Sequence, residues 1–341
     1  MTELLFALVL AMAPPQGLGA DTCADVVPVK GPAVSFAQVL GEPATLLQLT
    51  ECSTDPRIRV FLARPPRASE DAPLRLFGVL HDLSVRFRLS LRLQPDELAP
   101  FVVCTGSRAL LVRPSLGRVQ GYHLSGDVAF TVTLPGYAYQ DEPAVFVAGE
   151  PGRWFALWSA GGTTHWAEYT DNGQLRAHDS LPGLPAQLVV WQHRPWSVQY
   201  FVQNARVQRF ELVDLQNRQR AVSSPQRLAV WPVDSTWMLL QEGIQWFRLT
   251  PDGQRFPLAL EGKLRVFLRP GGGLVVLLQG TWSYEGPQRR PVYHLQRVFW
   301  LTADGVLHSR PLSTPLHPRV PVEFHGQGFV IKSCSRYWRL P

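Results

Sequence analysis

The sequence repeats one pattern three times: EYTDNGQ at residues 168–174, RLTPDGQ at 248–254 and WLTADGV at 300–306. In each copy, a stretch typical of a β-strand ends in Thr, and Asn-Gly or Asp-Gly follows it. These dipeptides supply the positive φ angles that tight hairpin turns need. The pattern therefore predicts the same hairpin in a repeated unit.

Two further short strands precede each hairpin, so the predicted unit has four antiparallel strands. Apolar and polar side chains alternate along these strands, most clearly in SVRFRLSLRL at residues 84–93. The first strands of successive units are predicted to begin near residues 44, 101, 144, 188, 228, 264 and 321. Four-stranded units of roughly 40 to 50 residues are typical of propeller blades.

Across residues 33–341 the chain resembles a β-propeller, which implies an all-β fold with one domain of seven blades. Six or eight blades are alternatives, because the two longest units contain insertions. The last unit supplies three strands, and residues 33–40 are expected to add the fourth and close the ring. No Trp-Asp repeat, regular kelch Gly-Gly pattern or sialidase Asp box is present. The resemblance is to extracytoplasmic bacterial propellers, which mostly bind proteins or glycans and in some families are enzymes.

Residues 1–20 are predicted to be a secretory signal peptide. Leu4 to Ala13 form an apolar run, too short to span a bilayer, and small residues follow up to Ala20. Glu3 and the lack of Lys or Arg before the run leave another interpretation, an apolar segment that is never removed. The mature domain is expected to cover residues 21–341, to be secreted or periplasmic, and to have no transmembrane segment.

Four cysteines follow the predicted signal: Cys23, Cys52, Cys104 and Cys334. An even number behind a signal peptide favours two disulfides, for which three pairings exist. Cys52 and Cys104 fall at the ends of innermost strands of adjacent blades, and Cys23 and Cys334 lie near the two chain ends. We therefore predict the pairs Cys52–Cys104 and Cys23–Cys334. The spacing of the cysteines fits no zinc site.

The formal net charge is +6, and arginines supply nearly all of the positive charge. A bias toward Arg can reflect a GC-rich genome, so no nucleic-acid partner is predicted; outside the cytoplasm, a basic surface would meet anionic glycans, lipid head groups or acidic proteins. The arginines lie mostly on the polar sides of strands and form no single block. The nine histidines form no metal-binding motif, and no serine lies in a nucleophile elbow. Neither a metal nor a cofactor is predicted. Seven tryptophans at strand positions are assigned to the core: Trp154, Trp158, Trp191, Trp231, Trp237, Trp246 and Trp300.

One candidate site lies in GYAYQDEP at residues 136–143. Asp141 and Glu142 are the carboxylate pair that a glycoside hydrolase or lyase would need, and Tyr137 and Tyr139 are able to stack on a sugar or a peptide. The alternative is a solvated turn whose aromatic residues pack on the neighbouring blade.

The second candidate is an insertion in the sixth unit, GTWSYEGPQRRP at residues 280–291. Trp282, Tyr284, Arg289 and Arg290 have the composition of an interface hot spot. The alternative is a loop folded back over its own blade. The leading hypothesis is a binding or scaffold module for a protein or glycan of the cell envelope, without catalysis. A carbohydrate-active enzyme and a purely structural assembly component are the rivals.

Overall fold

The computed structural model shows an all-β chain. It describes residues 26–27, 34–35, 45–52, 58–64, 73–80, 84–94, 97–105, 108–137, 144–149, 152–269, 272–285, 290–316, 322–325, 328–332 and 337–340. At some of these, Cys52 and Arg290 among them, only the backbone is described. None of the helices in the described residues is both long enough and apolar enough to cross a membrane.

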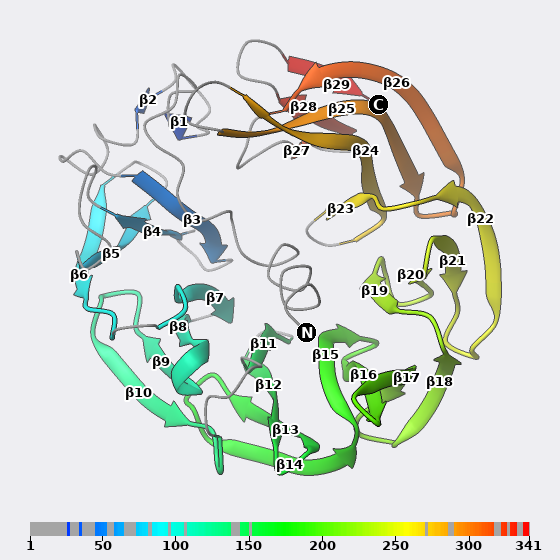
Figure 1. Cartoon of the computed structure of the whole chain (residues 1–341). Helices are drawn as coiled ribbons and strands as arrows, with labels where there is room; N and C mark the ends of the chain where they lie inside the picture. Colours follow the sequence, from blue (N-terminus) through cyan, green and yellow to red (C-terminus); the bar gives the residue numbers. More distant parts are fainter. Residues whose placement is uncertain are drawn as a thin grey trace. The chain divides into compact units, whose positions relative to one another are not determined.

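Antiparallel sheets follow one another along the described residues, and strands adjacent in sequence are adjacent in each sheet (Figure 1). Six sheets have four strands and the last has three. The first three sheets comprise β3 (Thr45–Cys52), β4 (Ile58–Arg64), β5 (Leu74–Leu80), β6 (Val85–Leu91); β7 (Phe101–Thr105), β8 (Arg108–Arg113), β9 (Arg118–Tyr122), β10 (Val128–Thr133); and β11 (Val145–Ala148), β12 (Arg153–Ala160), β13 (Thr163–Thr170), β14 (Leu175–Pro182).

The remaining sheets repeat this order. They comprise β15 (Leu184–Trp191), β16 (Arg194–Gln203), β17 (Arg206–Asp214), β18 (Gln219–Ser224); β19 (Leu228–Pro232), β20 (Met238–Glu242), β21 (Gln245–Leu249), β22 (Arg255–Glu261); β23 (Arg265–Leu268), β24 (Leu274–Glu285), β25 (Arg290–Thr302), β26 (Leu307–Pro315); and β27 (Val322–His325), β28 (Gly328–Lys332), β29 (Tyr337–Leu340). Successive four-stranded meanders are the blades of a β-propeller, so the predicted fold is confirmed. The first strands begin within one residue of the predicted positions, except in the fourth sheet, where β15 begins at Leu184 and not near residue 188.

The repeated turns have the predicted geometry. Gly173, Gly253 and Gly305 adopt φ angles of +76°, +83° and +83°, and the amide of each donates to the carbonyl of the Thr three residues earlier. A fourth copy, which the sequence pattern did not reveal, joins β9 to β10. There the Gly126 amide donates to the His123 carbonyl, and the His123 amide to that of Asp127. His123 takes the place of Thr and Ser125 that of Asn or Asp, so this copy lacks the residues that define the pattern.

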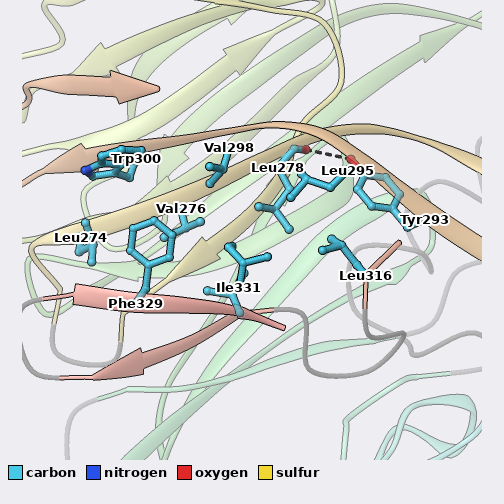
Figure 2. Packing of buried hydrophobic residues seen from close by; sticks show 11 residues of the cluster. Leu274, Val276, Leu278, Tyr293, Leu295, Val298, Trp300, Leu316, Phe329 and Ile331 are labelled. Carbon is cyan, nitrogen blue, oxygen red and sulfur yellow. Dashed lines mark hydrogen bonds between the residues drawn. The ribbon is translucent and has the colours of Figure 1, made fainter. Parts of the chain in front are cut away.

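The hydrophobic core lies between neighbouring sheets. One cluster joins the first and second sheets, and another joins the second and third. A third fills the space between the fifth and sixth sheets. A fourth joins the sixth sheet to the last, where Trp300 meets Phe329 edge to face at 5.8 Å between ring centroids (Figure 2). Six of the seven tryptophans assigned to the core are buried, and Trp231 is partly exposed.

The predicted closing strand is not found among the described residues. Val34 and Ser35 form β2, which pairs with β1 (Val26–Val27) and not with the last sheet. A strand of two residues has few backbone groups to pair, and here β1, a few residues earlier in the chain, is the strand that pairs with them.

The chain divides into two compact units, which are described separately. One covers Ala24–Pro195 with Gln199–Phe201, and the other covers Trp196–Val198 with Val202–Pro341. The prediction of one domain over residues 21–341 stays a prediction.

Candidate binding site on the sixth sheet

The hairpin of β24 and β25 is much longer than the rest of its sheet. β24 has 12 residues and β25 has 13, whereas β23 has 4. β23 pairs only with Val275–Leu278, but β24 continues to pair with β25 as far as Glu285 opposite Arg290. Residues 280–285 and 290–295 therefore form a paired extension of the hairpin, which we call the extended hairpin. The interpretation of residues 280–291 as a loop is corrected for these residues, because Trp, Tyr and Thr favour strands.

The extended hairpin begins at a β-bulge. The register between β24 and β25 shifts between Gln279 and Gly280. A Cβ at Gly280 would lie 2.2 Å from the carbonyl oxygen of His294, so the backbones approach too closely for any other residue. Bulges bend a strand and increase its twist. The bulge therefore sets the direction in which the side chains beyond it point.

Arg265, the first residue of β23, lies over three aromatic rings. Its guanidinium carbon is 4.9 Å from the ring centroid of Tyr293, 5.5 Å from that of Trp282 and 5.4 Å from that of Phe267. Trp282 and Tyr293 are cross-strand partners whose rings meet edge to face at 5.1 Å. Each contact of this kind contributes about 0.5–2 kcal/mol. We call Arg265, Phe267, Trp282 and Tyr293 the arginine–aromatic cluster.

Burial sets the electrostatics of this cluster. The Tyr293 hydroxyl donates to the Leu278 carbonyl at 3.0 Å, drawn as the dashed line in Figure 2. Desolvation raises the pKa of Tyr293 to about 12, and the charge of Arg265 opposes that rise. Desolvation also lowers the pKa of Arg265. A guanidinium nevertheless stays charged at neutral pH, so the cluster holds a positive charge in a mostly apolar place.

That charge lacks a complete set of acceptors. Nη1 of Arg265 is buried and has no hydrogen-bond partner within the described part of the chain, although the residue itself is partly exposed. Ser283 Oγ in β24 is likewise buried without a partner there. A buried polar group without a partner costs about 1–3 kcal/mol, and more when it is charged. Within the described residues, Ser283 of the extended hairpin and Arg265 of the neighbouring β23 therefore have unused hydrogen-bonding capacity.

The extended hairpin also exposes aromatic surface. Trp282 is 46% exposed and Tyr284 is 73% exposed, the largest fraction among the large hydrophobic side chains that the structure describes. The structure thus brings together two of the predicted binding residues with Arg265, which the sequence analysis missed. Arg265 carried no signal because one Arg at the start of a strand looks like any other. Of the remaining two, Arg290 pairs with Glu285 through the backbone, and Arg289 lies outside the described residues.

The other predicted candidate site is only partly described. Tyr137 packs against Gly117 and donates its hydroxyl to the Pro114 carbonyl at 2.8 Å, so it is held in the second sheet. Tyr139, Asp141 and Glu142 lie outside the described residues. A binding or catalytic role for these four residues stays a prediction.

The described cysteine and histidine side chains have structural contacts. Cys104 is disulfide-bonded, while the side chains of Cys23, Cys52 and Cys334 lie outside the described residues. His165 and His178 stack with Trp158 at 5.6–5.7 Å between ring centroids. No group of three or more His, Cys, Asp or Glu suited to a metal ion occurs in the part of the chain that is described.

Comparisons with known proteins give weak similarities of structure. No protein-family model and no curated protein matches the sequence. BamB from Moraxella catarrhalis shares 12% identity over 83% of this chain and 82% of that chain, with a TM-score of 0.45. A virginiamycin B lyase from Staphylococcus aureus shares 12% over 79% and 91%, with a TM-score of 0.46. A putative 6-phosphogluconolactonase from Bacteroides fragilis shares 10% over 78% and 84%, also at 0.46. Similarities at this level carry no argument about function.

Proposed function

We propose that the chain is a binding or scaffold module that contacts a protein or glycan partner through the extended hairpin. The observation that carries the proposal is the exposure of Trp282 and Tyr284 on a paired extension of the sixth sheet. Aromatic and arginine side chains dominate the energy of protein interfaces. A side chain already held in place loses little conformational entropy on binding, and the cluster under Trp282 holds its ring.

We further propose that the module works outside the cytoplasm, with its partner in the cell envelope. The apolar run in residues 4–13 and the even number of cysteines support this location. Cys104 as a disulfide-bonded residue is consistent with an oxidising compartment.

The predicted pair Cys52–Cys104 has support from neighbouring contacts. The Gln48 amide group donates to the Val102 carbonyl and accepts from the Val102 amide, both at 2.8 Å. These bonds hold β3 beside β7, the strands that carry Cys52 and Cys104. The pair Cys23–Cys334 is proposed from the sequence alone.

The test is affinity capture from an envelope extract of the source cells by the purified chain. The variant Trp282→Ala/Tyr284→Ala is expected to lower the captured partner about tenfold or more. The matched control is Ile244→Ala/Phe256→Ala in the fifth sheet, where the side chains are 63% and 47% exposed. The control should capture the partner as the unmodified chain does. Equal capture by all three proteins, with similar melting temperatures, would reject the extended hairpin as the contact surface.

A further inference from the structure

One strand edge of the extended hairpin has no partner strand in the part of the chain that the structure describes. Beyond Leu278, β23 no longer accompanies β24, and within the described residues β24 pairs only with β25 from Gly280 to Glu285. Among the described strands, none pairs with the backbone groups that alternate along this edge and point away from β25. The edge continues the line of β23, whose first residue is Arg265.

We propose that this edge binds an extended segment of a partner protein by strand addition, and that Arg265 binds a carboxylate at the end of that segment nearest β23. The inference deepens the proposed function and rests on it. Strand addition takes its affinity from main-chain hydrogen bonds and its specificity from side chains at alternate positions. Trp282 and Tyr284 are two residues apart, so they project from one face of β24 and contact alternate residues of the added strand.

The acidic residue follows from the chemistry of Arg265. Its charge is partly buried against three rings, and Nη1 lacks an acceptor within the described residues. A carboxylate is the acceptor whose planar geometry and charge match a guanidinium. The net charge of +6 also attracts acidic segments over a longer range.

The open edge favours a peptide over an acidic polysaccharide. A strand edge presents amide donors and carbonyl acceptors at the spacing of a polypeptide backbone. A sugar chain is able to neutralise Arg265 but lacks this alternating pattern. The two occupants therefore differ in a measurable way, namely whether binding depends on the ligand's own amide groups.

The test measures binding of fluorescein-labelled hexapeptides to the full chain by fluorescence anisotropy. The probes are Glu-Val-Thr-Val-Thr-Val and the reverse sequence, which places the acid at the other end, each with a version carrying Gln for Glu. At least one Glu peptide is expected to bind about tenfold or more tightly than its Gln version, because a charge-assisted pair is lost. N-methylation of alternate amides in that peptide should abolish binding.

Variants assign the acid preference to one side chain. Arg265→Gln should make the Glu and Gln peptides bind equally, and Arg265→Lys should keep part of the preference. The control is Arg297→Gln, which changes an exposed arginine 5.9 Å from the Phe299 ring in the same sheet and should leave the preference intact. Melting temperatures show that the variants are folded.

Three results would overturn the inference: no binding of any peptide, an acid preference unchanged in Arg265→Gln, or binding unaffected by N-methylation. Binding of tetragalacturonate that depends on Arg265, without peptide binding, would assign the site to an acidic glycan instead. The capture experiment decides the proposed function separately. If Trp282→Ala/Tyr284→Ala loses the partner while no acid preference is found, the contact surface stands and the acidic strand is rejected.

Discussion

The fifth and sixth sheets have the same strand order but differ in the length of their central hairpin. β20 and β21 have five residues each, against 12 and 13 in β24 and β25. The fifth hairpin closes directly at Gly243, whereas the sixth passes through the bulge at Gly280 and continues. Both sheets share one core cluster. Tyr293 and Leu295 of the extended hairpin also belong to the core cluster between the sixth and last sheets, whereas Trp282 and Tyr284 are exposed. The added residues therefore extend both the core and the exposed surface of the sixth sheet.

Arg255 of the fifth sheet and Arg265 of the sixth both lie over aromatic rings, but their hydrogen-bond partners differ. Arg255 lies 5.8 Å from the Phe247 ring centroid, and its Nη1 is 2.8 Å from Glu242 Oε2, so the fifth sheet pairs this charge internally. Arg265 lies over three rings, and its buried Nη1 has no such acceptor among the described residues. A cation on an aromatic ring is ordinary in this fold, and Arg248 of the fifth sheet, 5.5 Å from the Trp237 ring centroid, also has a buried Nε without a partner among the described residues. The sixth sheet differs because its arginine lies over three rings at the base of the extended hairpin.

Replacing one tryptophan of each sheet by Ala should give the largest difference in the free energy of unfolding between the two sheets. Trp237 is 0% exposed and donates its ring N–H to the Ala303 carbonyl at 3.2 Å. Trp237→Ala is expected to lower the free energy of unfolding by about 3–5 kcal/mol, because it leaves a cavity in the core. Trp282→Ala should lower it by about 1 kcal/mol, the value of a partly exposed cation–π contact.

Urea unfolding followed by circular dichroism measures both variants against the unmodified chain. A loss for Trp282→Ala as large as that for Trp237→Ala would mean that the Trp282 ring is part of the core, as Tyr293 and Leu295 are. It would then be unsuitable as an independent contact surface.

The repeat and its turns were predictable because they depend on local chemistry. Positive φ at Gly253 and Gly305 follows from Asp-Gly between two strand patterns. Burial of Trp154 and Trp158 follows from their place in an apolar strand. Such features need only a few neighbouring residues, and the sequence contains them directly.

The candidate site was predictable only in part. Trp282 and Tyr284 stood out by composition, but their pairing with β25 depends on a bulge that one glycine permits. Arg265 and Tyr293 come together only when β23 and β25 flank β24. Contacts between residues 28 positions apart leave no local pattern, and the missing acceptor of Arg265 is visible only in three dimensions.

Removing the Tyr293 hydroxyl should have a smaller effect on the free energy of unfolding, and this effect should depend on pH. The folded-state pKa of Tyr293 is raised from 10.0 to about 12 by burial. The stabilisation that goes with this shift is fully present below pH 10 and is lost as pH rises toward 12, because only the unfolded chain ionises in that window. Tyr293→Phe should therefore show a shallower fall in unfolding free energy between pH 10 and 12.

At neutral pH, Tyr293→Phe is expected to cost about 1 kcal/mol, the net value of one hydrogen bond. The matched control is Tyr284→Phe, since Tyr284 is 73% exposed and has no buried hydroxyl to lose. Its profile should follow that of the unmodified chain. Identical slopes for Tyr293→Phe and the unmodified chain would contradict a buried, neutral tyrosine in the cluster.

The smallest effect is expected where the two sheets are alike, in the turns after β21 and β25. Asp252 accepts from the Thr250 hydroxyl and Asp304 from the Thr302 hydroxyl, and these bonds lower both carboxyl pKa values below 3.8. A lowered pKa stabilises the fold above the unfolded value and loses that effect as pH falls through the folded value. In Asp252→Asn and in Asp304→Asn, the melting temperature should therefore fall slightly less at acidic pH than in the unmodified chain.

The two Asn variants should change the melting temperature equally at neutral pH. The charge of His308 makes a further, small contribution to the lowered pKa of the Asp304 carboxyl, and added salt should reduce it. Unequal shifts at neutral pH would show that the turns differ, and the contrast between the sheets would then extend beyond the hairpin. Equal shifts would agree with turns that are alike, and would leave the bulge, the extended hairpin and the arginine–aromatic cluster as the described differences between the two sheets.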